Sequence, residues 1–195
     1  MRRRAAILSM FVGVLLILGA AGLLIYNQWD SNRAATAATE TAVELSAQIA
    51  KALPKDLDSE DDANKEMPVI VFDGNTYIGI LSIPVLDLLL PVMETWDYDK
   101  LKISPCRYTG SYFNNDLVLM AHNYRHHFGN VSSLQQGDEV IFFDVNGVEY
   151  GYMIELVETL NSTDVDKMIE SEYDLTLFTC TYGGQMRIAI RCLAQ

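Results

Sequence analysis

The segment 175–193, LTLFTCTYGGQMRIAIRCL, constrains the fold of this chain more than any other stretch. Residues 175–181 are rich in β-branched and aromatic side chains, and residues 186–193 have the composition of a returning strand. Gly183 and Gly184 lie between them and tolerate the positive φ of a tight turn. The segment therefore predicts a β-hairpin, and a turn centred on the two glycines places Cys180 opposite Arg187.

The two-residue period of a strand divides this hairpin into two faces. We expect one face to lie in the core, and it carries Leu175, Leu177, Ile188, Ile190 and Cys192. We expect the other to line a groove or face solvent, and it carries Thr176, Phe178, Cys180, Arg187, Ala189 and Arg191. An arginine beside a cysteine favours the thiolate and can hold an oxyanion. Such a nucleophile also needs a proton partner, and histidine is the obvious residue type.

An uncharged apolar run, Ala5–Tyr26, follows three arginines at positions 2–4. Its 22 residues exceed the roughly 20 that span a bilayer core, so we expect a transmembrane helix. Basic residues on its short N-terminal side predict that this end is cytoplasmic and that the remainder of the chain is outside. A cleavable signal peptide is the rival interpretation, but its apolar region is usually only about 7–15 residues long.

Charge and cysteine content narrow the function classes. The chain has 26 acidic and 14 basic residues and a net charge of −12, so nucleic acid is not an expected partner. Its three cysteines are odd in number, and Cys106, which follows Pro105 in an expected loop, has no evident partner. No C-x-x-C spacing is present. We therefore expect neither a metal nor another cofactor.

Composition also divides the chain into segments. We expect a cytoplasmic basic tail at 1–4, the membrane anchor at 5–26, a helical stalk with an acidic linker at 27–66, and one compact domain at 67–195. The stalk helix, 34–53, has a thin apolar stripe made of Ala38, Ala42, Leu45, Ile49 and Ala52. This stripe allows three alternatives: the stalk packs on the domain, associates with another copy, or is a solvated spacer.

Within residues 67–195, strand patterns recur with only brief helical segments between them. Strands are predicted at 77–83, 86–92, 117–122, 139–144 and 148–160, before the hairpin. Short helices are predicted near 98–103, 130–134 and 164–170. This order is typical of an all-β barrel or sandwich.

His122 ends the apolar run LVLMA and begins the polar loop NYRHHFGN. A reactive side chain at the end of a core strand is held rigidly and is still accessible to a substrate. His126 and His127 lie farther along the same loop, so spacing alone leaves them open as the base.

Several segments together resemble the sortases, the membrane-anchored cysteine transpeptidases of Gram-positive bacteria. TLFTC at 176–180 matches their TLxTC signature, and IGILSIPVLDLLLPV at 78–92 is similar to their opening strands. NDLVLMAHNY resembles the strand that delivers their histidine, and FGNVSSLQQGDEV resembles the helix and turn that follow it. The resemblance covers 78–193 and implies an all-β, eight-stranded sortase-like β-barrel preceded by a transmembrane helix and a stalk.

The resemblance also implies site residues and partners. Carried over by position, the nucleophile is Cys180, the histidine is His122 and the arginine is Arg187, with Thr179 as a substrate contact at the groove edge. The implied substrate is a surface protein with an LPxTG-like sorting signal. The acceptor is an amine on a peptidoglycan precursor or on a protein lysine. Arg191 shares the face of Arg187 and is its rival, but it lies farther from the thiol.

The match departs from individual subclasses. The segment 161–173 is too short for the long helix of class B sortases, and no Asp-Pro-aromatic lid motif of class C precedes Tyr77. The subclass therefore stays open. Two alternatives to a transpeptidase also remain: a catalytically idle, membrane-tethered protein that binds sorting signals, and a hydrolytic cysteine peptidase.

Overall fold

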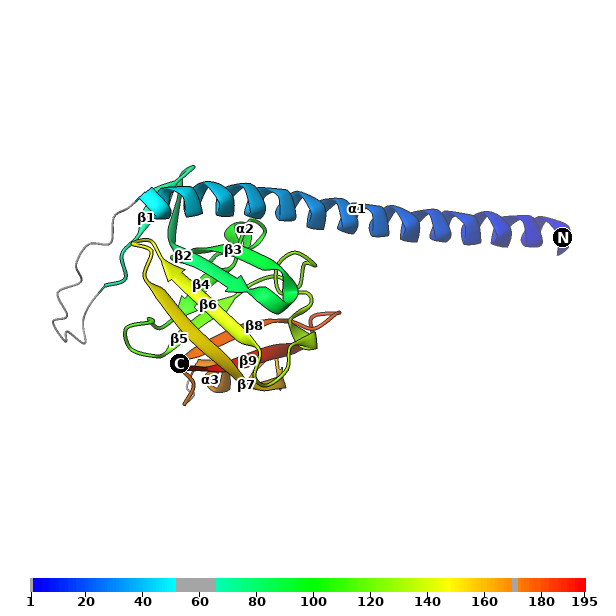
Figure 1. The fold of residues 1–195 in the computed structure, drawn as a ribbon. Helices are drawn as coiled ribbons and strands as arrows, with labels where there is room; N and C mark the ends of the chain where they lie inside the picture. Colours follow the sequence, from blue (N-terminus) through cyan, green and yellow to red (C-terminus); the bar gives the residue numbers. More distant parts are fainter. Residues whose placement is uncertain (1, 52–65, 170–171) are drawn as a thin grey trace. The chain divides into compact units, whose positions relative to one another are not determined.

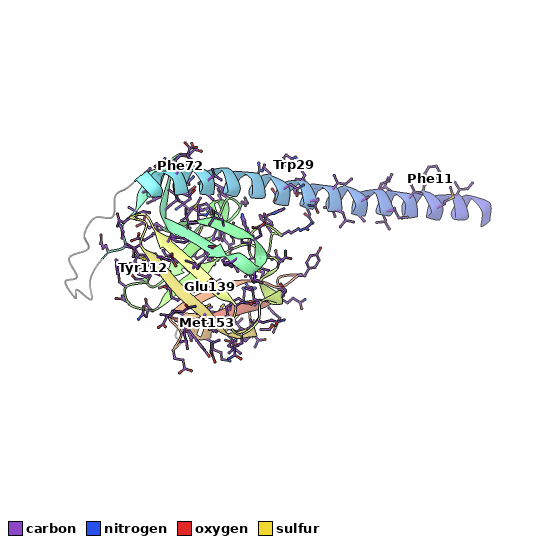
Figure 2. All side chains as sticks on the ribbon, viewed as in Figure 1. Phe11, Trp29, Phe72, Tyr112, Glu139 and Met153 are labelled. Atoms are coloured by element: carbon purple, nitrogen blue, oxygen red, sulfur yellow. The ribbon has the colours of Figure 1, made fainter. Side chains whose placement is uncertain are left out.

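The computed structural model describes residues 2–51, 66–169 and 172–195, and the chain divides into two units between Arg33 and Ala34. Helix α1 (Arg2–Lys51) begins in the first unit and continues into the second. Its segment Met10–Asp30 has a mean hydropathy of 2.1, is not buried, and is long and apolar enough to cross a membrane. Side chains such as Phe11 and Trp29 project from this helix (Figure 2). The segment suits a membrane anchor or a signal sequence.

The second unit contains a closed β-barrel (Figure 1). Its strands pair in the order β2 (Asn75–Ile83), β3 (Leu88–Met93), β4 (Cys106–Thr109), β5 (Leu117–Met120), β8 (Leu175–Cys180), β9 (Met186–Ala194), β7 (Glu149–Asn161) and β6 (Glu139–Asp144). A further pairing of β6 with β2 completes the ring of eight. Strand β1 (Ile70–Phe72) pairs with β2 outside this ring. The expected eight-stranded barrel is thus confirmed.

Short helices connect the strands where the sequence predicts them. They are α2 (Tyr98–Leu101), the 3-10 helix η2 (Val131–Ser133) and α3 (Val165–Ile169). Helix α2 begins after Asp97, because the carboxylate of this residue accepts hydrogen bonds from the backbone N–H groups of Asp99 and Lys100, at 2.9 and 2.8 Å.

Three sequence predictions are wrong in detail. The predicted strand 117–122 ends at Met120, so His122 follows β5 instead of ending it. The first residue of the predicted strand 86–92, Leu86, belongs to a 3-10 helix, η1 (Pro84–Leu86), which ends where Asp87 adopts a left-handed φ of 52°. Cys106, expected in a loop, instead begins β4 and is fully buried. Strand β4 has only four residues and a bulge between Arg107 and Thr109, so it has no clear alternating pattern.

The barrel interior is filled by apolar side chains from its strands. The inner face of the hairpin contributes to this core as expected, through Leu175, Leu177, Ile188, Ile190 and Cys192. Opposing strands add large residues such as Leu81, Leu119 and Phe142. This packing fixes the register of β5, β8 and β9, because a slip of one residue would turn the apolar set outward.

A second apolar cluster includes a residue of the stalk. Leu45 is fully buried with Tyr77, Ile80, Met93, Leu101 and Cys106, and Ala42 is also buried. Of the three alternatives for the stalk, packing on the domain is therefore the one observed for this stretch. The side chains of Ala38 and Ile49, residue Ala52 and the acidic linker up to residue 65 lie outside the described residues.

Candidate active site

The predicted site residues lie on, or just after, three neighbouring strands. β5 and β8 run parallel, and their last paired residues are Met120 and Phe178. His122 and Cys180 each follow two residues later in the sequence, so a continued register would bring them side by side. The thiol residue also lies opposite Arg187 in the antiparallel pairing of β8 with β9. Adjacent strands are about 4.8 Å apart. Cys180 and Arg187 are therefore direct partners across β8 and β9, and His122 follows the end of β5, the strand on the other side of β8.

Two hydrogen bonds hold β5 and β8 together beyond their last paired residues. The backbone N–H of Ala121 donates to the carbonyl of Phe178 at 3.2 Å. The hydroxyl of Thr179 donates to the carbonyl of Ala121 at 2.8 Å, and Thr179 is only 2% exposed. This hydroxyl is thus used inside the protein, which favours a positioning role for Thr179 over the contact at the groove edge that the resemblance implies.

Cys180 differs from the other two cysteines in its accessibility. It is half-buried, whereas Cys106 and Cys192 are fully buried, and none of the three forms a disulfide. Burial raises the pKa of both the Cys106 thiol and the Cys192 thiol to about 12. Because the thiolate is the nucleophilic form, Cys180 is the cysteine suited to covalent chemistry.

Arg187 lies at the start of β9 with its guanidinium against the turn. Its Nη1 donates to the carbonyls of Gly184 and Met186 at 3.0 and 3.1 Å. Gly183 and Gly184 have φ values of 94° and 76°, as a turn that requires glycine would. Among the described residues no acceptor pairs with Nε or Nη2 of Arg187, so these donors can face a carbonyl or an oxyanion.

Arg191, the rival of Arg187, has a structural position. It is 2% exposed and forms an ion pair with Glu158 of β7 at 2.9 Å. It also donates to the hydroxyl of Thr176 at 3.0 Å and to the carbonyls of Lys167 and Met168 in α3. Its donors are thereby taken up in joining β9 to β7 and α3.

The three histidines occupy three different environments. His122 is half-buried, and the centroid of its ring lies 5.0 Å from that of Tyr124. His126 is exposed. His127 is fully buried, and burial, followed by the charge of His122, lowers its pKa to about 4. Register and accessibility together favour His122 as the proton partner of Cys180.

The expected exposure of the outer hairpin face is partly wrong. Thr176, Phe178, Ala189 and Arg191 are all buried, which leaves Cys180 and Arg187 as the accessible members of the set. A third apolar cluster covers this face, made of Val118, Leu160, Met168, Phe178 and Ala189. Met168 comes from α3, so this short helix closes the face that strand periodicity alone left open.

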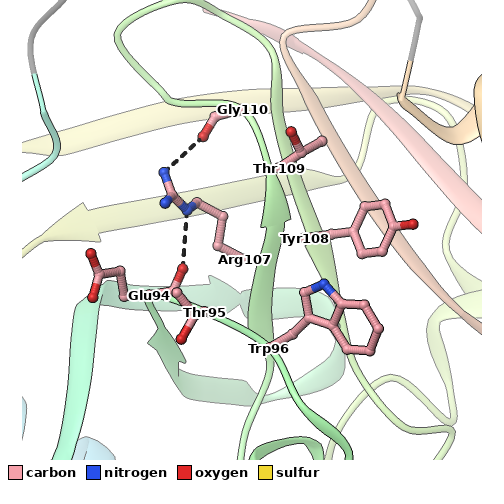
Figure 3. A pocket seen from close by; sticks show the side chains of 7 residues that line it. All are labelled: Glu94, Thr95, Trp96, Arg107, Tyr108, Thr109 and Gly110. Carbon is pink, nitrogen blue, oxygen red and sulfur yellow. Dashed lines mark hydrogen bonds between the residues drawn. The ribbon is translucent and has the colours of Figure 1, made fainter.

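An open pocket of about 380 Å³ lies beside β4 and was not anticipated from the sequence. Figure 3 shows its lining side chains, Glu94, Thr95, Trp96, Arg107, Tyr108, Thr109 and Gly110. Trp96 stacks on Tyr108 with ring centroids 5.7 Å apart, and Tyr108 meets Phe178 edge-on at 5.3 Å. These rings reach the strand of the nucleophile. The sequence did not predict this aromatic cluster, because Trp96 follows β3 whereas Tyr108 lies in β4, and the two positions share no strand or helix period.

The site thus offers an accessible thiol paired with a guanidinium, and an imidazole just after the neighbouring strand β5. These groups suit acyl transfer through a thioester, with a proton donor and an oxyanion partner. Among the described residues, no group of three or more His, Cys, Asp or Glu side chains is arranged to hold a metal ion.

Comparison with known families agrees with this arrangement. The sortase domain family matches residues 81–194, which is more than half of the chain. The chain therefore belongs to the sortase family, whose members are transpeptidases of the cysteine class. No curated protein matches it significantly.

Several solved sortases share the fold. Sortase D5 transpeptidase of Clostridium perfringens is 19% identical with a TM-score of 0.56, and the alignment covers 65% of this chain and 82% of that chain. Sortase C-3 of Streptococcus pneumoniae is 18% identical with a TM-score of 0.57 and 84% coverage of both chains. Sortase C of C. perfringens, solved with a C-terminal cell wall sorting motif, is 21% identical with a TM-score of 0.55, covering 80% and 90%.

Proposed function

We propose that this sortase cleaves an LPxTG-like sorting signal through Cys180 and joins the acyl group to an amine. The observation that carries the proposal is the pairing of Cys180 with Arg187 across β8 and β9. The position of His122, two residues after the end of β5 and therefore next to β8, supports it. The amine belongs to a peptidoglycan precursor or to a protein lysine. The apolar segment of α1 supports a membrane-anchored enzyme that acts outside the cell.

In the first half-reaction the Cys180 thiolate adds to the carbonyl carbon of the threonine in the signal. Arg187 donates to the oxyanion that forms, which is where preorganised donors lower the barrier most. The carbon–nitrogen bond then breaks, and His122 as imidazolium gives its proton to the leaving amine. The products are a thioester on Cys180 and a free peptide amine.

In the second half-reaction an incoming amine attacks the thioester. Neutral His122 removes a proton from this amine, the carbon–sulfur bond breaks, and the Cys180 thiolate is released. A new amide bond replaces the one that was cleaved. Arg187 serves the second tetrahedral intermediate as it served the first, because both intermediates place negative charge on the same oxygen.

The proposal is tested by incubating the full chain in detergent with a library of LPxTG-like peptides. Mass spectrometry should find an acyl adduct on Cys180, and the Cys180→Ala variant should form none. Cys192→Ala serves as the matched control, because that thiol is buried in the barrel core. An adduct that persists in Cys180→Ala would exclude the proposed nucleophile.

Addition of a glycine-type or diaminopimelate-type amine then distinguishes a transferase from a hydrolase. In a transferase the amine should divert the product from the free acid to the amide. A product that stays acid at high amine concentration would instead identify a hydrolytic cysteine peptidase. A protein that binds the peptides without any turnover would be the idle signal-binding protein.

A further inference from the structure

The loop that follows β5 is folded tightly around one carbonyl group. The oxygen of Tyr124 accepts hydrogen bonds from the backbone N–H groups of His127 and Gly129, each at 2.9 Å. The N–H of Phe128 donates to the carbonyl of His122 at 3.3 Å. A Cβ atom at Gly129 would lie only 2.7 Å from the Tyr124 oxygen. The loop therefore has little freedom to change shape without moving His122.

The rings of three residues, His122, Tyr124 and His127, contact one another in sequence from the candidate site into this loop. The ring of His122 lies 5.0 Å from that of Tyr124, and the ring of Tyr124 lies 5.5 Å from that of His127. These centroid distances are within the range of favourable ring contacts. Tyr124 is thus held between an accessible imidazole and a buried one.

His127 has an unusual environment for a buried polar residue. It is fully buried, and neither Nδ1 nor Nε2 has a hydrogen-bond partner within the described residues. The charged groups that face it are the histidines of its own loop, His122 and His126, which oppose its protonation. The Ile103 carbonyl, in the segment after α2, lies near enough to favour the protonated form, but it does not meet the geometry of a hydrogen bond and burial outweighs it.

An unpartnered imidazole in the interior is costly, because it loses its hydrogen bonds to water without replacement. At pH 7 the ring of His127 stays neutral and packs as an aromatic surface behind Tyr124.

We infer that His127 is a positioning residue for the sortase reaction: its neutral ring supports Tyr124 against the imidazole of His122. Through this contact it fixes the direction of the His122 ring towards Cys180. A positive charge on His127 would be forced out of its apolar surroundings and would release Tyr124. The inference rests on the proposed role of His122, but the ring contacts among His122, Tyr124 and His127 can be tested without any turnover.

The direct test uses NMR of the full chain in detergent with ¹³Cε1-labelled histidine. The sequence contains three histidines, so single substitutions assign all three signals. In the wild type, we expect the His122 ring signal to shift a second time as His127 becomes protonated in acid. His127→Phe should abolish that second shift, and His126→Gln, at the exposed neighbouring position, should keep it. A His127 signal that titrates at the ordinary value of 6.5, or a His122 signal that ignores it, would overturn the inference.

Kinetics with a sorting peptide give the second test. His127→Ala should lower kcat by about tenfold with little change in KM, because misdirecting a proton donor weakens the chemical step more than binding. His127→Phe restores the ring and should return kcat to within about twofold of the wild type. His126→Ala should leave kcat unchanged. Equal losses in the Ala and Phe variants would contradict a positioning role, and absence of turnover in the wild type would instead count against the proposed function.

Discussion

At the scale of the residue, Arg187 and Arg191 show how position decides the role of one side-chain type. Both lie on the same face of β9, four residues apart. Arg191 is enclosed by Glu158, Thr176 and two carbonyls of α3. Among the described residues, Arg187 donates only to the carbonyls of Gly184 and Met186, both through Nη1, so its Nε and Nη2 donors remain available.

Replacement of Arg187 by lysine should therefore impair catalysis without unfolding the protein. A single ammonium group cannot reproduce the planar fork of donors, so we expect a loss in kcat of about 100-fold. Peptide turnover with matched circular dichroism spectra measures this. Full activity in Arg187→Lys would refute the oxyanion role.

Arg191→Lys is the matched comparison for the other arginine. It keeps the charge near Glu158 but loses part of the donor network to α3. We expect a lower free energy of unfolding, by about 3 kcal/mol, because a buried charge is left incompletely paired. Denaturant titration checks this. A variant as stable as the wild type would contradict the structural role assigned to Arg191.

The buried His127 predicts how stability depends on pH. Its pKa is about 4 in the folded protein and has the ordinary value of 6.5 when the chain is unfolded. Between these values the unfolded chain binds more protons, so the free energy of unfolding falls as the pH drops from about 6.5 to about 4. The loss amounts to about 3 kcal/mol, and it should be absent above pH 7.

Denaturant titrations of the wild type and His127→Phe, across this pH range, measure the effect. The difference between the two proteins should be constant above pH 7 and should change in favour of the variant on acidification. Parallel curves would show that His127 does not carry the dependence. His126→Gln provides the control for a histidine in contact with solvent.

At the scale of the element, the hairpin was the part most readily predicted. The two glycines fixed the turn, and the turn fixed the pairing of Cys180 with Arg187, which the structure confirms. Strand β6 agrees with its predicted range, 139–144. These features depend on neighbouring residues in the sequence, where periodicity and turn chemistry are informative.

Other features depend on contacts between distant segments and could not be predicted. Met168 packs in the same apolar cluster as Phe178, which requires α3 to lie against β8. The choice among three histidines requires the register of β5 with β8, a parallel pairing of strands far apart in the sequence. Local patterns carry no information about either, because both are set by tertiary packing.

The part of α1 that carries Ala42 and Leu45, within the predicted stalk, should contribute to the stability of the second unit. Leu45 is fully buried in the apolar cluster that also contains Cys106, so Leu45→Ala should lower the free energy of unfolding by about 3 kcal/mol. It should also make Cys106 react with a thiol reagent, which mass spectrometry can localise. Val43→Ala is the control, because that side chain is 60% exposed on the same helix. Unchanged protection of Cys106 would contradict the packing of this stretch.

At the scale of the whole molecule, the apolar segment Met10–Asp30 predicts the behaviour of the full chain in cells. If it is the anchor, Leu16→Arg combined with Ile17→Arg should weaken insertion by about 3 kcal/mol for each arginine. The variant should then leave the membrane fraction on carbonate extraction. Val71→Arg, at an exposed position of β1, should not. A double variant that stays in the membrane would contradict the assignment.

The pairing of β6 with β2 has a consequence for the proposed recognition of an extended sorting peptide. A sheet with an open border can capture such a chain by backbone hydrogen bonding alone, whatever its sequence. In the described part of this protein the eight strands of the barrel close on one another, and the three residues of β1 form only a short edge strand beside them. Under the proposed function, the choice of substrate would therefore depend on side chains at the rim of the barrel. Side chains can recognise a particular sequence, and they can also let the product dissociate.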